Sequence, residues 1–166
     1  MDKKGLFYGK NDNVSGVKVL GFEMPWGNIW KSILGWINAS GTQKVKMTHG
    51  PEDGSTAAGY NTTGADYVTI DGATPSGTNG GYISVYTAGD FGLIPITASG
   101  SATTYLCDSL WFNNSQTDFA LVGGDSNDGA PCGAFCSGLS GAAGRAPWNF
   151  GAALSYKPLA ATATVG

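Results

Sequence analysis

At 166 residues the chain fits one domain of ordinary size and is too short for two. Nine basic and 12 acidic residues leave a net charge of −3, which lacks the positive surface that attracts nucleic acid, so we expect no nucleic-acid partner. The hydrophobic fraction of 42%, with 5 Trp, 7 Tyr and 7 Phe, excludes a disordered chain, because enough apolar surface is available to offset the entropy of ordering.

The surface chemistry is polar but weakly charged. Only 13% of the residues are charged, and 27 are glycine, a balance that favours an extracellular binding scaffold over a cytosolic enzyme. No run of about 18 apolar residues is present, which predicts no membrane insertion. The first residues lack the apolar core of a signal peptide, so export would need another route or an upstream region.

The cysteines do not predict a cross-linked framework. Cys107, Cys132 and Cys136 are odd in number and lack a CxxC spacing, which is typical of neither a disulfide scaffold nor a zinc site. Because unpaired cysteines are commonly buried in protein cores, we expect free, buried thiols.

In chain order, the first predicted elements are a strand and a helix. Residues 17–22 alternate apolar and polar side chains as a half-buried strand does. Pro25 then stands where the first turn of a helix tolerates proline. Large apolar residues follow at spacings of three and four, namely Trp26, Ile29, Trp30, Ile33 and Ile37. This period predicts a helix over residues 26–38.

Short strands bounded by turn residues are expected in the remainder of the chain. They are predicted at residues 44–48, 67–70, 82–86, 104–112, 119–122, 133–136 and 148–157. Residues 50–81 form a polar, glycine-rich insertion that would carry only a short hairpin, and such long loops are usually functional or capping elements. Residues 160–166 are small and polar and predict a flexible tail, which leaves a single domain over residues 1–159.

Catalytic motifs fail on spacing or on missing partners. The sequence Gly138-Leu139-Ser140-Gly141 does not match a nucleophile elbow, and the single histidine, His49, has no nucleophile placed near it. With Glu23 and Glu52 as the only glutamates, no carboxylate pair is singled out for glycoside hydrolysis. We therefore expect a protein that is not an enzyme.

A calcium loop is approached but not completed. Residues 125–129, with sequence DSNDG, offer carboxylate and amide oxygens ahead of a glycine turn, as hard cations require. The offsets differ from those of an EF-hand, and no bidentate Glu follows. We expect no metal and no other cofactor.

Several segments carry a family resemblance. Residues 21–37 include GFE, then WGNIW and GWI, while the middle of the chain includes GLIP at 92–95 and Asp108 with LWF at 110–112. The C-terminal block joins ALVGG at 120–124 to WNFGAALSYK at 148–157. Together these segments resemble the C-type lectin fold in its formylglycine-generating-enzyme-like branch, as found in the variable proteins of diversity-generating retroelements.

The resemblance implies a fold and a function. The implied fold is α+β and C-type-lectin-like, with mostly short antiparallel strands, one or two helices and a variable region over about residues 119–157. In this family an error-prone reverse transcriptase rewrites template adenines, so that AAC asparagine codons become any codon ending in C. The implied function is a hypervariable binder that recognises a host-cell or surface ligand through residues 125–147.

The segment satisfies the coding restriction that this process imposes. Codons ending in C never encode Lys, Glu, Gln, Met or Trp, and residues 121–147 contain none of them. The positions that match or lie among the family's asparagines are the candidate ligand-binding residues: Asp125, Ser126, Asn127, Asp128, Pro131, Ser137, Gly138, Ser140, Gly141, Gly144, Arg145 and Pro147. Ser126 departs from the family pattern, which has Trp there. Arg145 is the expected anchor, because a guanidinium both stacks and makes paired hydrogen bonds.

A rigid scaffold should separate folding from specificity. Apolar and small residues between the candidate positions are expected to form the core: Phe119, Leu121, Gly133, Phe135, Leu139, Trp148, Phe150, Ala152 and Leu154. Substitutions at solvent-facing positions would then cost little, within about 0.5 kcal/mol.

The implied setting is extracellular. We expect a protein or glycan ligand on a cell surface, a location on a virion tail or bacterial cell surface, and a homo-oligomer such as a trimer that raises avidity. One alternative is a structural phage-tail or adhesin domain without diversification. Another is an enzyme of the formylglycine-generating type, for which Cys132 and Cys136 invite comparison but metal or base partners are missing.

Overall fold

A computed structural model describes residues 7–8, 18–20, 22–23, 25–46, 60–104, 106–142 and 144–151. Within these ranges every regular element is a β-strand, so the expected α+β class is wrong and the described chain is all-β. The strands are β1 (Phe7–Tyr8), β2 (Lys18–Val19), β3 (Phe22–Glu23), β4 (Trp30–Ala39), β5 (Thr42–Val45), β6 (Val68–Thr69), β7 (Ser76–Gly77), β8 (Gly81–Tyr82), β9 (Val85–Gly89), β10 (Gly92–Ala98), β11 (Ser109–Phe112), β12 (Thr117–Val122), β13 (Ser137–Ala142) and β14 (Phe150–Gly151).

The predicted helix over residues 26–38 is replaced by β4. In the pairing of β4 with β12, Ile33 lies opposite Ala120, whereas Ile37 lies opposite the adjacent Phe119. Residues 34–36 are therefore extra on β4 and form a bulge, where Gly35 has a φ of +87°. Because the bulge adds residues to the strand, the regular alternation of inward and outward side chains is interrupted there. Apolar residues then recur at spacings of three and four residues, which is the spacing expected of a helix. Ile and Trp also favour strands.

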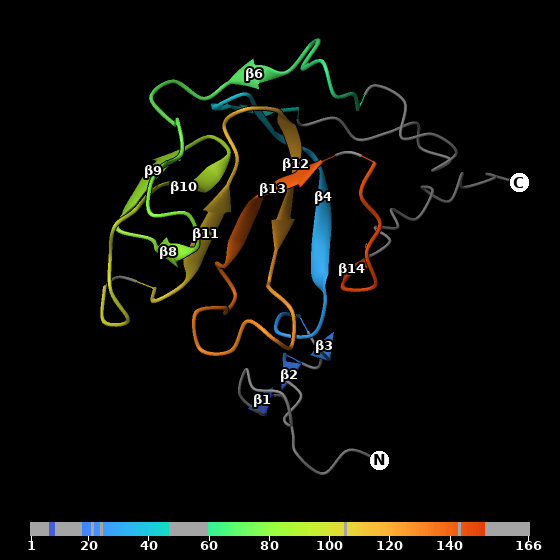
Figure 1. Ribbon diagram of the computed structural model, residues 1–166. Coiled ribbons are helices and arrows are strands. Elements are labelled where there is room, and N and C mark those ends of the chain that lie inside the picture. Colours follow the sequence, from blue (N-terminus) through green and yellow to red (C-terminus); the bar gives the residue numbers. More distant parts are fainter. Residues whose placement is uncertain are drawn as a thin grey trace, which may run out of the picture.

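One large mixed sheet organises the described chain (Figure 1). Its order is β6-β5-β4-β12-β13-β11-β8, and β14 pairs with β4. β12 runs antiparallel to both β4 and β13, while β13 and β11 are parallel. A smaller sheet has the order β7-β10-β9, and β1, β2 and β3 form a third.

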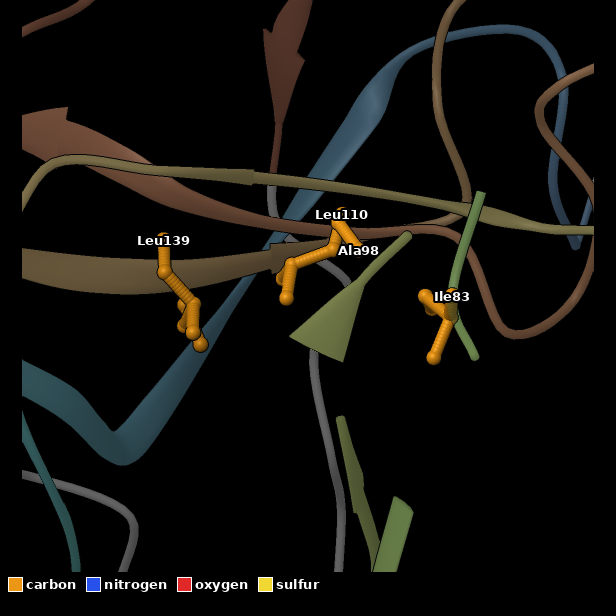
Figure 2. Packing of buried hydrophobic residues seen from close by; sticks show 5 residues of the cluster. Ile83, Ala98, Leu110 and Leu139 are labelled. Atoms are coloured by element: carbon orange, nitrogen blue, oxygen red, sulfur yellow. The ribbon is translucent and has the colours of Figure 1, made fainter. Parts of the chain in front are cut away.

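The large sheet packs apolar residues on both faces, because neighbouring residues of a strand point to opposite sides. One cluster of buried residues contains Leu110 and Ala120, while the residues that follow each of them, Trp111 and Leu121, belong to a second cluster. β10 of the smaller sheet covers the first cluster. In Figure 2 its Ala98 lies close to Leu110, with Leu139 and Ile83 on either side.

The second cluster is built around Trp30. This ring packs with Leu121, Cys132 and Cys136, and partly buried Trp111 and Phe150 complete the cluster. The Trp30 and Trp111 rings meet edge to face, with centroids 5.6 Å apart. The residues after β12 therefore close this face of the sheet.

Two other sequence predictions are wrong, and several fall on residues that the structure does not describe. Residues 133–136 form a turn, not the expected strand, and the strand begins at Ser137. The expected insertion over 50–81 contributes β6, β7 and β8 to the sheets from its described part, instead of a hairpin of its own. Residues 50–59, His49 and everything after Gly151, including Ala152, Leu154 and the expected tail 160–166, lie outside the described residues.

Two of the expected core residues are exposed. Phe135 keeps 45% and Trp148 keeps 72% of its surface accessible, whereas Leu121 and Leu139 are buried as expected. Among the residues that the structure describes, none belongs to a helix long and apolar enough to cross a bilayer.

Candidate ligand-binding surface

The candidate residues lie in three successive stretches of chain: the loop from Gly123 to Cys136, the strand β13, and the segment 144–149 that leads to β14. In Figure 1 the first loop lies below the lower ends of β12 and β13, and the last segment runs beside β4. We call the first of these stretches, residues 123–136, the β12–β13 loop, and the last, residues 144–149, the β13–β14 loop.

Backbone contacts with residues ahead of β4 hold the start of the β12–β13 loop. The Gly27 N–H donates to the Gly123 carbonyl at 2.7 Å, and Ser126 N–H donates to the Asn28 carbonyl at 3.2 Å. Gly123 has a φ of +87°, which favours glycine, and an added Cβ would lie 3.2 Å from Trp26 Cα. The loop therefore leaves the sheet along a fixed path.

Asp125 and Asp128 lock this loop from inside. The Asp125 carboxylate accepts the Asn127 N–H at 2.8 Å and a hydrogen bond from the Asn149 side-chain amide. The Asp128 carboxylate accepts the Asp125 N–H at 2.8 Å and a bond from the Trp30 side chain. Burial raises the pKa of Asp128, and these two hydrogen bonds oppose the rise. Asp125 is 4% exposed, so its side chain supports the loop.

Asp108 supports the second half of the loop. Its buried carboxylate accepts the Phe135 N–H at 2.7 Å and a second backbone bond from Gly133. Burial raises the pKa of Asp108, and both hydrogen bonds lower it. Burial and, secondarily, the negative charge of Asp108 raise the pKa of Tyr86 to about 12.

A disulfide closes the same turn. Cys132 and Cys136 are bonded, with Cα atoms 5.0 Å apart, so the expectation of free thiols is wrong for this pair. The expectation failed because the intervening residues turn. A turn brings the two Cα atoms within bonding range, whereas residues four apart on the expected strand would be about 13 Å apart.

Four candidate positions belong to β13, in the interior of the sheet. Ser137 is 4% exposed and its hydroxyl donates to the Phe135 carbonyl at 3.0 Å. Gly138 and Gly141 are buried, and an added Cβ would lie 3.3 Å from the Trp30 ring and 3.1 Å from Leu121, respectively. Ser140 is half-buried. Most of this strand is therefore occupied by packing within the domain.

The β13–β14 loop carries exposed candidates. Gly144 and Arg145 are exposed and Pro147 is half-buried. The Arg145 guanidinium lies 5.5 Å from the centre of the Phe150 ring, a cation–π contact. The Arg145 N–H also donates to the Ala142 carbonyl at 2.9 Å, which sets the first turn of the loop.

The two loops are tied together at their bases. Asn149 bonds the Asp125 carboxylate through its side chain, and its carbonyl accepts the Trp30 N–H at 2.8 Å. The structure thus brings the bases of both loops to Trp30. Exposed or half-exposed side chains at Ser126, Asn127, Asp128, Pro131, Ser140, Arg145 and Pro147, with Gly144, remain accessible. Asp125, Ser137, Gly138 and Gly141 are buried.

Sequence reasoning did not predict the supporting role of Asp108, Trp30 and Asn149. These residues stand in the motifs that carry the family resemblance, but they act on the loops over long separations in the chain, which no local pattern indicates. Within the described ranges, no group of three or more His, Cys, Asp or Glu residues could hold a metal ion. A shallow hollow lined by Ile70, Thr87, Phe91 and Ile94, among others, takes no residue from either loop.

The fold and these loops define an all-β domain with two anchored surface loops. Comparisons of the chain with protein-family models, curated proteins and solved structures found no match.

Proposed function

We propose that this chain is a hypervariable ligand-binding domain, diversified by a retroelement, that recognises a surface ligand through its β12–β13 and β13–β14 loops. The supporting observation is the separation of roles within residues 121–147. Internal hydrogen bonds of Asp125, Asp128 and Asn149 hold the backbone of both loops, while Asn127 and Arg145 present their side chains to solvent and Ser126 is half-exposed.

Fewer residues would contact the ligand than the retroelement would diversify; we call these contacting residues the contact set. Asp125 and Ser137 are buried and hydrogen-bonded, and Gly138 and Gly141 adjoin large rings or apolar side chains. Substitutions at these positions would act on packing before they reached a ligand. The Asp128 carboxylate is likewise occupied within the loop. We therefore assign ligand contact to Ser126, Asn127, Pro131, Ser140, Gly144, Arg145 and Pro147.

The proposed role is binding without catalysis, on a virion tail or bacterial surface and against a protein or glycan. The contact residues contain one cation, Arg145, and are otherwise uncharged, so the contact surface carries little charge. Such a surface would bind modestly as a single copy, and a homo-oligomer would raise its avidity.

The decisive test is deep sequencing of the coding region across a growing culture or phage population. We expect substitutions to concentrate at the candidate codons between Asp125 and Pro147 and to be absent from Trp30, Leu121 and Leu139. Even spread along the gene, or no variation, would refute diversification and favour a structural tail or adhesin domain.

A display library tests the separation of roles directly. One library randomises Ser126, Asn127 and Arg145, and a matched library randomises Ser137, Gly138 and Gly141. The first should retain folded, protease-resistant members at high frequency and yield binders to host cells, because these side chains face solvent. The second should be largely unfolded; equal survival of both libraries would contradict the assignment.

A further inference from the structure

The smaller sheet ends in a strand that has a partner on one side only. The order of this sheet is β7-β10-β9, and no other described strand pairs with β9. Backbone N–H and C=O groups that point outward from such an edge can pair with a further strand. The outer edge of β9 therefore offers hydrogen-bonding groups to another extended chain.

β9 lacks the features that usually protect an edge strand from pairing. Its sequence, VYTAG, contains neither a charged residue nor a proline, and the nearest charged residue, Asp90, follows in the turn. The ladder with β10 has one bulge, whose extra residue, Ile96, belongs to β10, so the backbone of β9 stays regular. Two identical uncharged edges do not repel one another, whereas a charged edge repels its own copy. The edge is therefore compatible with a second copy of itself.

One face of β9 combines an exposed apolar side chain with open space. Val85, Thr87 and Gly89 share this face, because alternate residues of a strand point to the same side. The Val85 side chain is 46% exposed. A Cβ added at Gly89 would meet no atom within 4 Å, and the same holds for Gly92, its partner on β10. The face thus carries a projecting side chain at one end of β9 and an empty position at the other.

The shallow hollow of the structure adjoins the empty position. Gly89 and Gly92 line it together with the apolar side chains of Ile70, Phe91 and Ile94. None of the residues that line the hollow carries a charge. This surface suits a small apolar side chain that arrives beside Gly89, and Val85 of a second copy is such a side chain.

We propose that β9 pairs antiparallel with β9 of a second copy of this chain, which joins the smaller sheets of the two copies into one. A two-fold axis at Thr87 places Val85 of each copy directly opposite Gly89 of the other. Residues directly opposite one another in an antiparallel pair point to the same face, so each Val85 enters the open space over Gly89. The two copies of Asp90 lie at opposite ends of this pair. The contact is made twice, and the assembly closes at two copies.

The pairing leaves the ligand-binding loops uncovered. In Figure 1 β9 lies at the left of the molecule, whereas the β12–β13 loop lies at the bottom and the β13–β14 loop on the right. A dimer formed through β9 therefore presents two contact sets, which raises avidity without a new ligand contact. The inference goes beyond the proposed binding role and does not depend on it.

Sedimentation equilibrium of the full chain tests the pairing. One pair of short strands is a small interface, so the average mass should rise from one chain towards two between about 10 μM and about 1 mM. Gly89→Val fills the empty position from within the same copy and should weaken association at least about tenfold. Thermal unfolding of this variant should show an intact fold, because Gly89 has open space and does not have a positive φ.

The double variant Val85→Gly, Gly89→Val tests the register. With the axis at Thr87 each exchanged valine again lies opposite a glycine, so association should return to within about threefold of the original. Phe135→Lys is the control, because Phe135 is exposed to a similar extent, 45%, on the β12–β13 loop, and this change should leave association unaltered.

Three results would overturn the pairing: the mass of one chain at every concentration, a dimer that Gly89→Val does not weaken, or a double variant that associates no better than Gly89→Val. Loss of the dimer in Phe135→Lys would place the contact on the loop and would likewise overturn it. The population sequencing described above is independent of these outcomes, so failure of the β9 pairing and failure of the diversified binder are distinguishable.

Discussion

Single residues decide where the backbone of this protein can bend. Gly35 forms the bulge of β4 at a φ of +87°, and its carbonyl accepts the Lys46 N–H at 2.7 Å. A Cβ there would lie 2.5 Å from the Lys46 carbonyl oxygen and 2.8 Å from the Tyr60 ring. Gly72 has a similar φ of +70° but open space around the Cβ position. Substituting each of these two glycines therefore separates the free-energy cost of a positive φ from the cost of a steric clash.

Gly35→Ala should therefore lower the free energy of unfolding by about 3 kcal/mol or more, since it adds a backbone clash to an unfavourable φ. Gly72→Ala should cost only about 1–2 kcal/mol, from the φ alone. Urea denaturation followed by tryptophan fluorescence measures both. Equal losses would show that the bulge opens to accept a side chain.

Asn149 is the residue that joins the two loops. Asn149→Ala leaves the buried Asp125 carboxylate without one of its donors, which should cost about 1–3 kcal/mol in denaturant unfolding. Asn127→Ala is the control, because that exposed side chain should contribute within about 0.5 kcal/mol. A similar loss for both variants would mean that the link between the loops adds nothing.

At the scale of elements, the β12–β13 loop behaves as a cross-linked unit resting on Asp108. The disulfide closes a short turn, so in the chain-entropy account it should contribute about 2 kcal/mol. Reduction should lower the urea midpoint of the protein accordingly. The double variant Cys132→Ser, Cys136→Ser should show the same lower stability and no response to reductant. A continued response in that variant would assign the redox effect elsewhere.

Elements also show how a pattern can mislead. The sheet buries Trp30 and Ile37 through a bulged strand, and the bulge changes a period of two into spacings of three and four. Likewise, the odd number and the spacing of the cysteines predicted free thiols, and residues 133–136 were predicted to be extended, whereas a turn there brings Cys132 and Cys136 into a disulfide. In both cases a local irregularity, the bulge in β4 or the turn at residues 133–136, changes the structure of the segment. Sequence periodicity does not predict such irregularities.

For the whole molecule, buried carboxyl groups link stability to pH. Burial raises the pKa values of Asp108, Asp118 and Asp128, each opposed by hydrogen bonds. Asp118 is fully buried with one carboxylate oxygen lacking a hydrogen-bond partner, while the other accepts from Gln116 at 2.7 Å. A carboxyl with a raised folded pKa takes up its proton in the folded state first.

These groups should therefore make the folded state more stable as the pH falls from their raised pKa values towards the unfolded value of about 4. Asp118→Asn should reduce this gain and raise stability at neutral pH, since it removes a buried charge. Thermal unfolding from pH 7 to pH 4 measures the effect. An unchanged pH profile in the variant would show that Asp118 is not the titrating group. The exposed Asp71→Asn is the control.

The sequence alone determined that the chain has many short strands and an apolar residue set that supplies its core, including Leu121 and Leu139. Local alternation and turn residues encode such features, since they depend on neighbours in the chain. The strands near residues 44, 68, 82, 110 and 120 were predicted at or close to their positions. The ligand-binding role and its diversification remain a prediction from the resemblance.

Only the tertiary structure decided which candidate positions face solvent. Gly138 and Gly141 lie in an interior strand, and Asp125 is turned inward by Asn149, because partners distant in the chain surround them. The same long-range contacts leave Trp148 exposed, although its apolar character favours the core. Burial depends on which strands become neighbours, and strand order is set by pairing between distant segments, which a local pattern does not contain.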